Sequence, residues 1–183
     1  MIEGMAVTAA DFSVLLAIRS FFESGLLDAP MIWISRAGDA GAVWLAAGAL
    51  LMLRTSTRRL GAAVLLAVVL YAAVGNGLIK PLAGRLRPCD VSDAVELIIA
   101  CPPSFSFPSG HTGASFAAAG VFWMLKSPWR RAALAAAVLI AFSRLYLFVH
   151  FPSDVAGGVL CGLAAAFLAV RITALPALKI RLS

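Results

Sequence analysis

Three short segments of the sequence carry side chains that could handle a phosphate group. They are Lys80-x6-Arg87-Pro88, Pro108-Ser109-Gly110-His111 and Ser143-Arg144-x5-His150-x3-Asp154. Together they supply cations that can bind phosphate oxygens, two imidazoles for nucleophilic or acid–base chemistry, and a carboxylate. Groups of these types in one site can bind a phosphate ester and break it, so the three segments predict an active site.

The third segment predicts a nucleophile and the group that orients it. His150 falls in a turn, and Asp154 falls in the first turn of the next helix, where Pro152 suits the first position. A carboxylate there can accept the Nδ1 proton of His150, which leaves the Nε2 lone pair free to attack phosphorus. A structural histidine is the alternative, and the neighbouring arginine disfavours it.

The second segment opens an Ala-rich apolar stretch at 111–125. Ser109 is a typical N-cap residue, and Gly110 permits close approach of a ligand to the backbone. The free N–H groups of a helix N-terminus bind anions. An ordinary capped helix would explain this segment if it stood alone. The presence of the other two segments favours an anion site.

The first segment contributes two cations. Lys80 and Arg87 lie two helical turns apart if the helix continues, whereas Pro81 and Gly84 predict that the helix ends and the chain wraps. Either geometry can direct both cations to one point, where an arginine fork and a lysine point charge suit phosphate. Arg85 is expected to be an anchor for lipid headgroups.

Composition indicates an integral membrane protein. Apolar residues make up 62% of the 183 residues and charged residues 13%, and the mean hydropathy is +0.96. Soluble domains lie far from these values. A chain of this length forms about one domain with room for about five or six membrane crossings. The sequence therefore predicts an all-α membrane-embedded helical bundle in a single domain, residues 1–183.

Apolar segments predict where the helices lie. Five transmembrane helices are expected at about 29–53, 58–80, 111–125, 129–149 and 155–172. Before them, residues 12–27 carry Arg19 and Glu23 on one helical face. This pattern favours an interfacial helix, with a sixth transmembrane span as the alternative.

Basic residues predict the orientation of the chain. Three segments hold most of them: Arg54, Arg58 and Arg59; Lys126, Arg130 and Arg131; and Arg171, Lys179 and Arg181. The positive-inside rule makes these segments cytoplasmic, which places the 81–110 loop and the 150–154 turn on the extracytoplasmic face of a multi-pass protein in the inner or plasma membrane. The same rule accounts for the net charge of +6, so we expect no nucleic-acid binding.

Taken together, the three motifs resemble the signature of the type 2 phosphatidic acid phosphatase superfamily, also called lipid phosphate phosphatases. Each defined position of that signature is present, in order, between residues 80 and 154. The resemblance is to the bacterial membrane-bound branch, which shares its active site with vanadium haloperoxidases and acid phosphatases. It implies a hydrolase with that type of site on a helical bundle.

The resemblance also implies which residues bind the phosphate. Lys80, Arg87 and Arg144 would hold the phosphate oxygens, and Ser109 and the N–H of Gly110 would complete the site. Three cations and a helix terminus can neutralise the charge of phosphoryl transfer. We therefore expect hydrolysis that needs no metal and no cofactor and that vanadate inhibits.

For the chemical step, the resemblance implies that His150 attacks phosphorus and forms a phospho-histidine intermediate, with Asp154 orienting it. His111 would protonate the leaving oxygen and later activate water. The residues alone favour the roles of His150 and Asp154, whereas the role of His111 depends mostly on the resemblance.

A lipid substrate follows from a site at the outer leaflet, where a headgroup can reach the site while the tail stays in the bilayer. The resemblance points first to undecaprenyl diphosphate, whose conversion to the monophosphate recycles a cell-wall carrier. Phosphatidylglycerol phosphate, phosphatidic acid and diacylglycerol diphosphate, which would place the enzyme in phospholipid metabolism, are the alternatives. A non-catalytic transporter or binding component is disfavoured because the charges collect at one face, and a haloperoxidase-like activity would require vanadate.

Two cysteines lie in the loop between the first two motifs. A disulfide between Cys89 and Cys101 would stabilise the fold by roughly 3 kcal/mol through loop closure and hold Arg87 relative to His111. Cys161 is expected to be a packing residue. Small residues in the last spans permit close helix packing, either within one chain or between two chains. A homo-oligomer is therefore one of the two alternatives.

Overall fold

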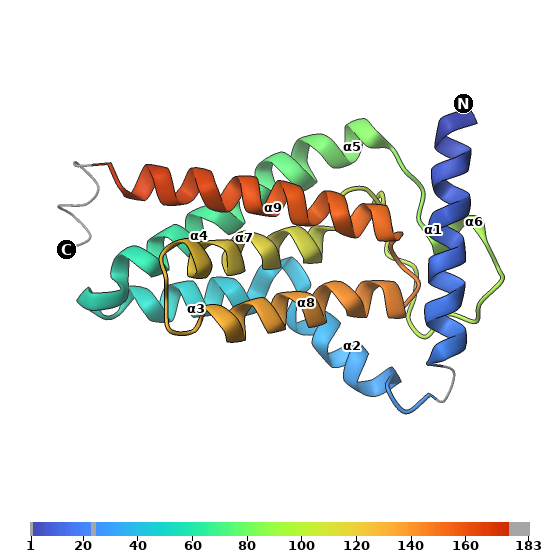
Figure 1. Cartoon of the computed structure of the whole chain (residues 1–183), viewed down its shortest axis with the longest axis horizontal. Helices are drawn as coiled ribbons and strands as arrows, with labels where there is room; N and C mark the ends of the chain where they lie inside the picture. The colour runs from blue at the N-terminus through green and yellow to red at the C-terminus, as the bar shows by residue number, and fades with distance from the viewer. Residues whose placement is uncertain (1, 23–24, 176–183) are drawn as a thin grey trace.

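The computed structural model describes residues 2–22 and 25–175, and all regular secondary structure in these ranges is helical (Figure 1). The longer helices are α1 (Ile2–Phe21), α2 (Asp28–Ala37), α3 (Ala42–Met52), α4 (Arg58–Tyr71), α7 (Gly110–Met124), α8 (Arg130–Tyr146) and α9 (Pro152–Thr173). The shorter elements are η1 (Asp39–Gly41), η2 (Thr55–Thr57), the π-helical η3 (Ala72–Ile79), α5 (Lys80–Ala83) and α6 (Pro88–Val91).

Helix α7 forms the centre of the bundle, where it packs against α4, α8 and α9. Small residues make this possible, since Ala117 and Ala118 are completely buried. A Cβ atom added to Gly162 of α9 would lie 2.5 Å from the carbonyl oxygen of Gly113 in α7, so the two backbones touch. The small residues of α7 and α9 therefore pack within one chain, which brings the start of α7 beside the start of α9.

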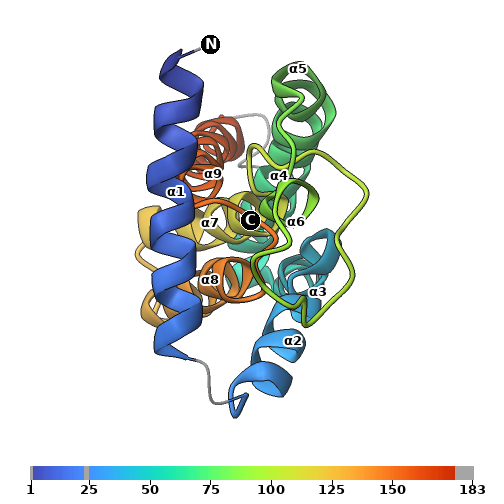
Figure 2. The same ribbon diagram turned by 90° about the vertical axis from the view of Figure 1, so that its right-hand side faces the viewer.

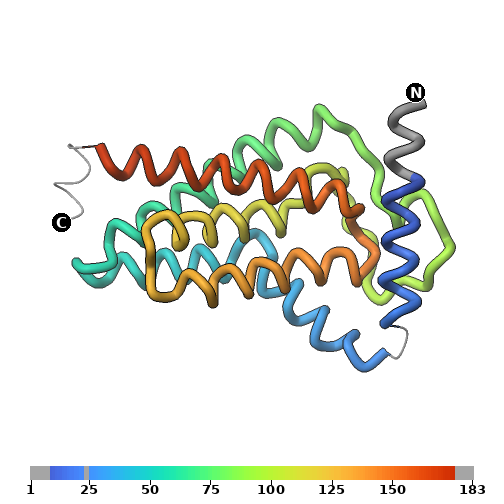
Figure 3. The backbone as a smooth tube through the Cα atoms, in the orientation of Figure 1, coloured from blue at the N-terminus to red at the C-terminus, as the bar shows by residue number. Residues whose placement is uncertain are grey.

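The first predicted span, 29–53, is wrong as a single helix. The structure divides it into α2 and α3, which meet at the bend in η1 (Figure 3). Ala40 and Gly41 have φ values of 50° and 71°, in the left-handed region that a continuous right-handed helix excludes. The bend places Asp39 beside the start of α7, where the site lies.

Two stretches of the described chain are long and apolar enough to cross a membrane, Thr55–Val91 and Pro152–Thr173. Asp39–Met52 is apolar but shorter. Helices α7 and α8 have 15 and 17 residues, fewer than the roughly 20 that a full crossing needs. Five transmembrane helices therefore remain a proposal, in which the short α7 begins in a protein-lined cavity below the membrane surface.

The basic segments and the motifs lie at opposite ends of the bundle. Figure 1 shows the α3–α4 turn, the α7–α8 loop and the end of α9 together at one end, which groups residues 54–59, 126–131 and Arg171. Lys179 and Arg181 lie outside the described residues. The α5–α7 loop and the start of α9, which carry the motifs, lie at the other end. This arrangement agrees with the predicted orientation, which stays a proposal.

Helix α1 lies across the motif-bearing end of the bundle (Figures 1 and 2). It begins earlier than the expected residue 12 and ends at Phe21, and Glu23 lies outside the described residues. Leu15 is completely buried against the bundle, and Phe12 contacts Phe151 edge to face with ring centroids 5.1 Å apart. The crosswise placement suits an interfacial helix, which we retain as a proposal.

Candidate active site

A cavity of about 690 Å³ lies at the end of the bundle that carries the three motifs. It is bounded by the end of α2, η1, η3, the start of α7 and the end of α8. Of the residues that the motifs predicted for the site, six line this cavity: Lys80, Arg87, Gly110, His111, Arg144 and His150. Asp154 lies behind His150 and Ser109 is buried in the start of α7, so neither lines the cavity.

Arg87 and His150 are in direct contact. Nη1 of Arg87 lies 3.1 Å from Nε2 of His150 and also donates to the carbonyl of Val149 at 2.7 Å. The other guanidinium nitrogens donate to the carbonyl and hydroxyl oxygens of Ser104, at 2.7 and 3.0 Å. Because a guanidinium can only donate, Nε2 of His150 must accept, and the ring proton of a neutral His150 lies on Nδ1.

Asp154 faces that Nδ1 atom. Its Oδ2 lies 3.6 Å from Nδ1 of His150 and accepts hydrogen bonds from the Phe151 N–H at 2.8 Å and the Ser106 hydroxyl at 2.5 Å. Pro152 occupies the first turn of α9, as expected, and Asp154 caps the same turn through Phe151. The local helix start therefore holds the carboxylate beside the imidazole.

Burial holds His150 in its neutral form. The side chain lies in the turn between α8 and α9 and is almost completely buried. Burial, aided by the charges of Arg87 and Arg144, lowers the pKa of His150 to about 3, although the nearby Asp154 carboxylate acts in the opposite direction. The imidazole therefore keeps the lone pair that a nucleophile needs at neutral pH.

The other two cations are also buried at the cavity wall. Lys80 donates to the carbonyls of Phe105 and Pro108, at 2.9 and 2.7 Å, and so ties the loop to the start of α5. Arg144 donates to the hydroxyl of Ser35 through Nη1. Its Nε is buried and has no hydrogen-bond partner among the described residues. An unpaired buried donor costs about 1–3 kcal/mol.

The start of α7 presents its backbone to the cavity. Ser109 is the N-cap residue but makes no side-chain cap bond, and its Oγ instead accepts from the Thr112 hydroxyl at 2.9 Å. The Ser109 carbonyl accepts from the Tyr71 hydroxyl at 2.9 Å. A Cβ atom at Gly113 would lie 1.9 Å from the Tyr71 ring, so glycine is required there. Gly110, but not the Ser109 side chain, is brought to the cavity.

His111 has a carboxylate partner that sequence reasoning did not single out. Nε2 of His111 lies 2.8 Å from Oδ1 of Asp39, and the Asp39 side chain is 64% exposed. The apolar segment is interrupted by Gly38-Asp39, followed by Gly41. This interruption is the sequence feature that could have indicated Asp39. The contact itself depends on the bend at η1.

Arg85 is not the headgroup anchor that the sequence predicts. Its Nη1 donates to Oδ1 of Asp154 at 2.8 Å, and its guanidinium lies 4.3 Å from the centroid of the Phe151 ring. The side chain is only 22% exposed. Arg36 also lies at the cavity wall. The structure therefore adds Arg85, Arg36 and Asp39 to the residues around the site.

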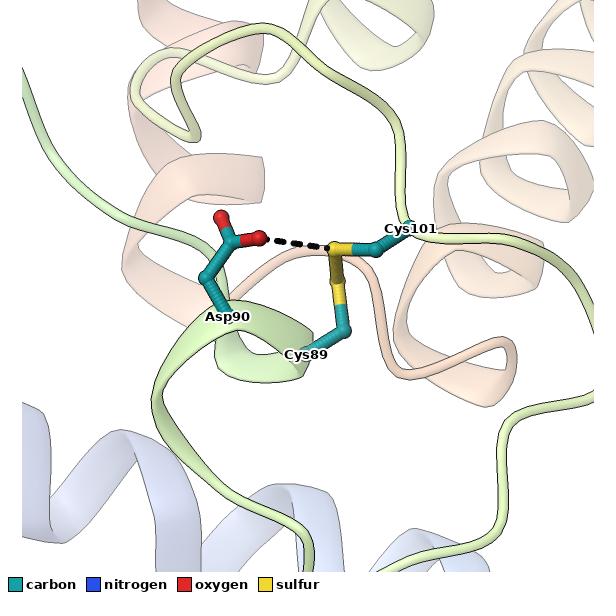
Figure 4. A group of neighbouring side chains, drawn as sticks. All are labelled: Cys89, Asp90 and Cys101. Carbon is teal, nitrogen blue, oxygen red and sulfur yellow. Dashed lines mark hydrogen bonds between the residues drawn. A yellow bond between two sulfur atoms is a disulfide. The ribbon is translucent and has the colours of Figure 1, made fainter.

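A disulfide joins Cys89 to Cys101 across the α5–α7 loop, with Cα atoms 5.9 Å apart (Figure 4). Oδ1 of Asp90 lies 3.2 Å from Sγ of Cys101, a close contact only, because a disulfide sulfur carries no proton. Oδ2 of Asp90 accepts from the Arg87 N–H at 3.0 Å, so the bridged segment also holds Arg87. Bonded sulfurs are not thiolates, so this group is no metal site. Cys161 is free and half-buried.

Comparison with known sequences identifies relatives over most of the chain. A sequence model of the PAP2 superfamily matches residues 60–175. An undecaprenyl-diphosphatase of Sulfolobus acidocaldarius is 32% identical over 165 residues, which cover 86% of this chain and 76% of the relative. A lipid A 4'-phosphatase of Bacteroides thetaiotaomicron is 30% identical over 110 residues, which cover 55% of this chain and 48% of the relative.

Solved structures share the fold. Aquifex aeolicus LpxE has a TM-score of 0.71 and 26% identity over 86% of this chain and 94% of its own. A PAP2 type phosphatidylglycerolphosphate phosphatase from Bacillus subtilis has the same TM-score and 28% identity over 91% of this chain and 86% of its own. With its three motifs gathered around one cavity, the chain belongs to the PAP2 superfamily and is a hydrolase of lipid phosphates.

Proposed function

We propose that this enzyme removes a phosphate from undecaprenyl diphosphate, yielding undecaprenyl phosphate, at the extracytoplasmic face and through a phospho-histidine intermediate. One observation carries the chemistry: two histidines and three buried cations meet at one cavity. A phosphate would supply the negative charge that the three cations favour.

The phosphate would bind among Lys80, Arg87 and Arg144, with the N–H of Gly110 directed toward it from the start of α7. Arg144 donates to the Ser35 hydroxyl, and Lys80 and Arg87 donate to backbone carbonyls, so the three side chains contribute mainly fixed charge. Such preformed charge stabilises the equatorial oxygens of the transition state without reorganisation. Because the cations neutralise this charge, the proposed reaction does not require a metal. The Ser109 hydroxyl supports the helix start.

Hydrolysis would proceed in two steps. The Nε2 lone pair of His150 attacks phosphorus, the bond to the leaving oxygen breaks, and His111 donates a proton to that oxygen. Asp154 stabilises the positive charge that develops on the His150 ring. In the second step His111 takes a proton from water, the water oxygen bonds to phosphorus, and the P–N bond breaks to release phosphate. His150 returns to its neutral form.

Two observations support a diphosphate lipid. Arg36, a fourth cation, lines the cavity and is exposed, so it could contact a second phosphate group. The Sulfolobus acidocaldarius relative, matched over 86% of this chain, is an undecaprenyl-diphosphatase. Phosphatidylglycerol phosphate, phosphatidic acid, diacylglycerol diphosphate and the lipid A phosphates of other relatives are the competing substrates.

Phosphate release from each lipid by the protein in detergent with EDTA tests the proposal. The wild type is compared with His150→Ala and with Arg54→Gln, a matched change in a cation at the opposite end of the bundle. We expect activity in EDTA, inhibition by vanadate, loss in His150→Ala and no change in Arg54→Gln. Full activity of His150→Ala would exclude the mechanism, and preference for another lipid would replace the substrate.

The variant Arg36→Gln tests whether the enzyme recognises the second phosphate group of a diphosphate lipid. Loss of a cation that binds the second phosphate should raise KM for undecaprenyl diphosphate more than for phosphatidic acid, which carries one phosphate. Equal effects on both substrates would remove Arg36 from recognition of the second phosphate.

A further inference from the structure

The carboxylate that faces His150 is linked to the N-terminal helix by a buried polar network. Arg85 donates through Nη1 to Oδ1 of Asp154 at 2.8 Å and through Nη2 to Oδ2 of Asp11 in α1 at 2.6 Å. Ser153 joins the same group, since its N–H and hydroxyl donate to the two Asp11 oxygens at 3.0 and 2.5 Å. One arginine fork therefore spans two carboxylates from opposite ends of the sequence.

The Asp11 side chain is buried inside the protein and does not lie on its surface. Its side chain is 6% exposed, whereas most neighbouring polar positions of α1 face outward. A buried carboxylate is costly unless it is paired and hydrogen-bonded, and Asp11 accepts from both Arg85 and Ser153. Phe12 and Leu15 pack beside it on Phe151 and Phe148 of the turn that holds His150. Helix α1 thus contacts the nucleophile's turn through both polar and apolar groups.

We propose that Asp11 and Arg85 are positioning residues of the hydrolytic reaction, so that the N-terminal helix is part of the active site rather than only a membrane contact. This inference rests on the proposed roles of His150 and Asp154. Asp11 acts on Asp154 through Arg85, and neither Asp11 nor Arg85 lines the cavity.

The charges explain why the network needs both carboxylates. Asp154 must keep negative charge to stabilise the imidazolium that forms when His150 attacks phosphorus. Arg85 alone beside Asp154 would hold the carboxylate in place but cancel much of that charge. Asp11 shares the guanidinium, so the group of three retains a net negative charge while the fork fixes the orientation of Asp154.

The test measures kcat and KM for lipid phosphate hydrolysis by purified Asp11→Asn, with Ser13→Ala as the matched control. Asn is isosteric with Asp but uncharged, and the Ser13 hydroxyl donates only to the Ala9 carbonyl of its own helix. We expect kcat to fall about 10- to 100-fold in Asp11→Asn with KM nearly unchanged, as for other groups that support a reacting residue, and no change in Ser13→Ala. Unchanged kcat in Asp11→Asn would overturn the proposal.

Arg85→Lys keeps the test decisive if Asp11→Asn folds poorly. Lysine retains the charge but cannot fork to two carboxylates, so kcat should fall again while the thermal midpoint stays close to that of the wild type. Wild-type kcat in Arg85→Lys would also overturn the proposal. Because His150→Ala is measured alongside, an inactive His150→Ala with a fully active Asp11→Asn would reject this inference alone, whereas an active His150→Ala would reject the proposed mechanism.

Discussion

Nη1 of Arg87 lies 3.1 Å from Nε2 of His150, so a cation proposed to bind phosphate touches the atom proposed to attack phosphorus. This contact sets the tautomer of His150, because arginine can only donate. It also means that an arriving phosphate meets the cation and the nucleophile together. The same guanidinium is held from behind by Ser104 and Val149, so its position does not depend on the ligand.

Arg87→Lys should reduce kcat by roughly 10²-fold, the loss typical of removing one donor from a transition-state site. Lysine cannot bond Ser104, Val149 and His150 together, so both the charge placement and the tautomer control weaken. Steady-state kinetics of phosphate release measure the effect, with Arg54→Gln as the matched control. A lysine variant with wild-type kcat would show that charge alone is sufficient at this position.

Acid should destabilise the wild type more than His150→Gln. The folded-state pKa of His150 is about 3 and its ordinary value is 6.5, so between these values the unfolded chain binds a proton that the folded chain does not. The stability contributed by neutral His150 is therefore complete above the ordinary pKa and is lost as the pH falls toward the folded pKa. Glutamine does not titrate.

Thermal midpoints of both proteins, measured from about pH 7 to about pH 5, check this prediction. The midpoint of the wild type should fall further than that of His150→Gln, and His111, present in both, cancels from the comparison. Parallel decreases would mean that His150 is not neutral in the folded protein.

Asp39→Asn should slow hydrolysis of phosphatidic acid, whose leaving group is an alkoxide, by about 10-fold or more, since a carboxylate 2.8 Å from His111 stabilises the protonated ring that a general acid must carry. The loss should be smaller for undecaprenyl diphosphate, whose leaving group is a phosphate that departs without a proton. Rates with both substrates test this, with the exposed Asp93→Asn as the control. The same loss on both substrates would contradict a role of Asp39 in leaving-group protonation.

Loss of the Cys89–Cys101 disulfide should destabilise the protein by roughly 3 kcal/mol, because the bond closes a loop between residues 12 apart. The double serine variant should unfold at a lower temperature and have a lower kcat/KM, since the loop carries Arg87. Cys161→Ser is the control, because Cys161 is free. A double variant as stable as this control would mean that other contacts order the loop.

Features that depend on local spacing could be predicted from the sequence. His150 and Asp154 are one helical turn apart, so the start of a single helix brings them together and their pairing follows from the chain itself. The N-cap position of Ser109 is local for the same reason. Ionisable groups are rare in an apolar chain, so those in the three motifs were expected to lie in one site. This expectation allowed the family and the chemistry to be predicted from the sequence.

The sequence by itself thus determined the helical class, the family and the set of residues that we propose to bind the phosphate. Only the tertiary structure decided which side chains contact and orient these residues and their neighbours. Asp39 contacts His111 across 72 residues of sequence, and Asp11 contacts Arg85 across 74. These contacts depend on the bend at η1 and on how α1 crosses the bundle, and such long-range geometry is set by the packing of whole helices, not by the spacing of residues within one.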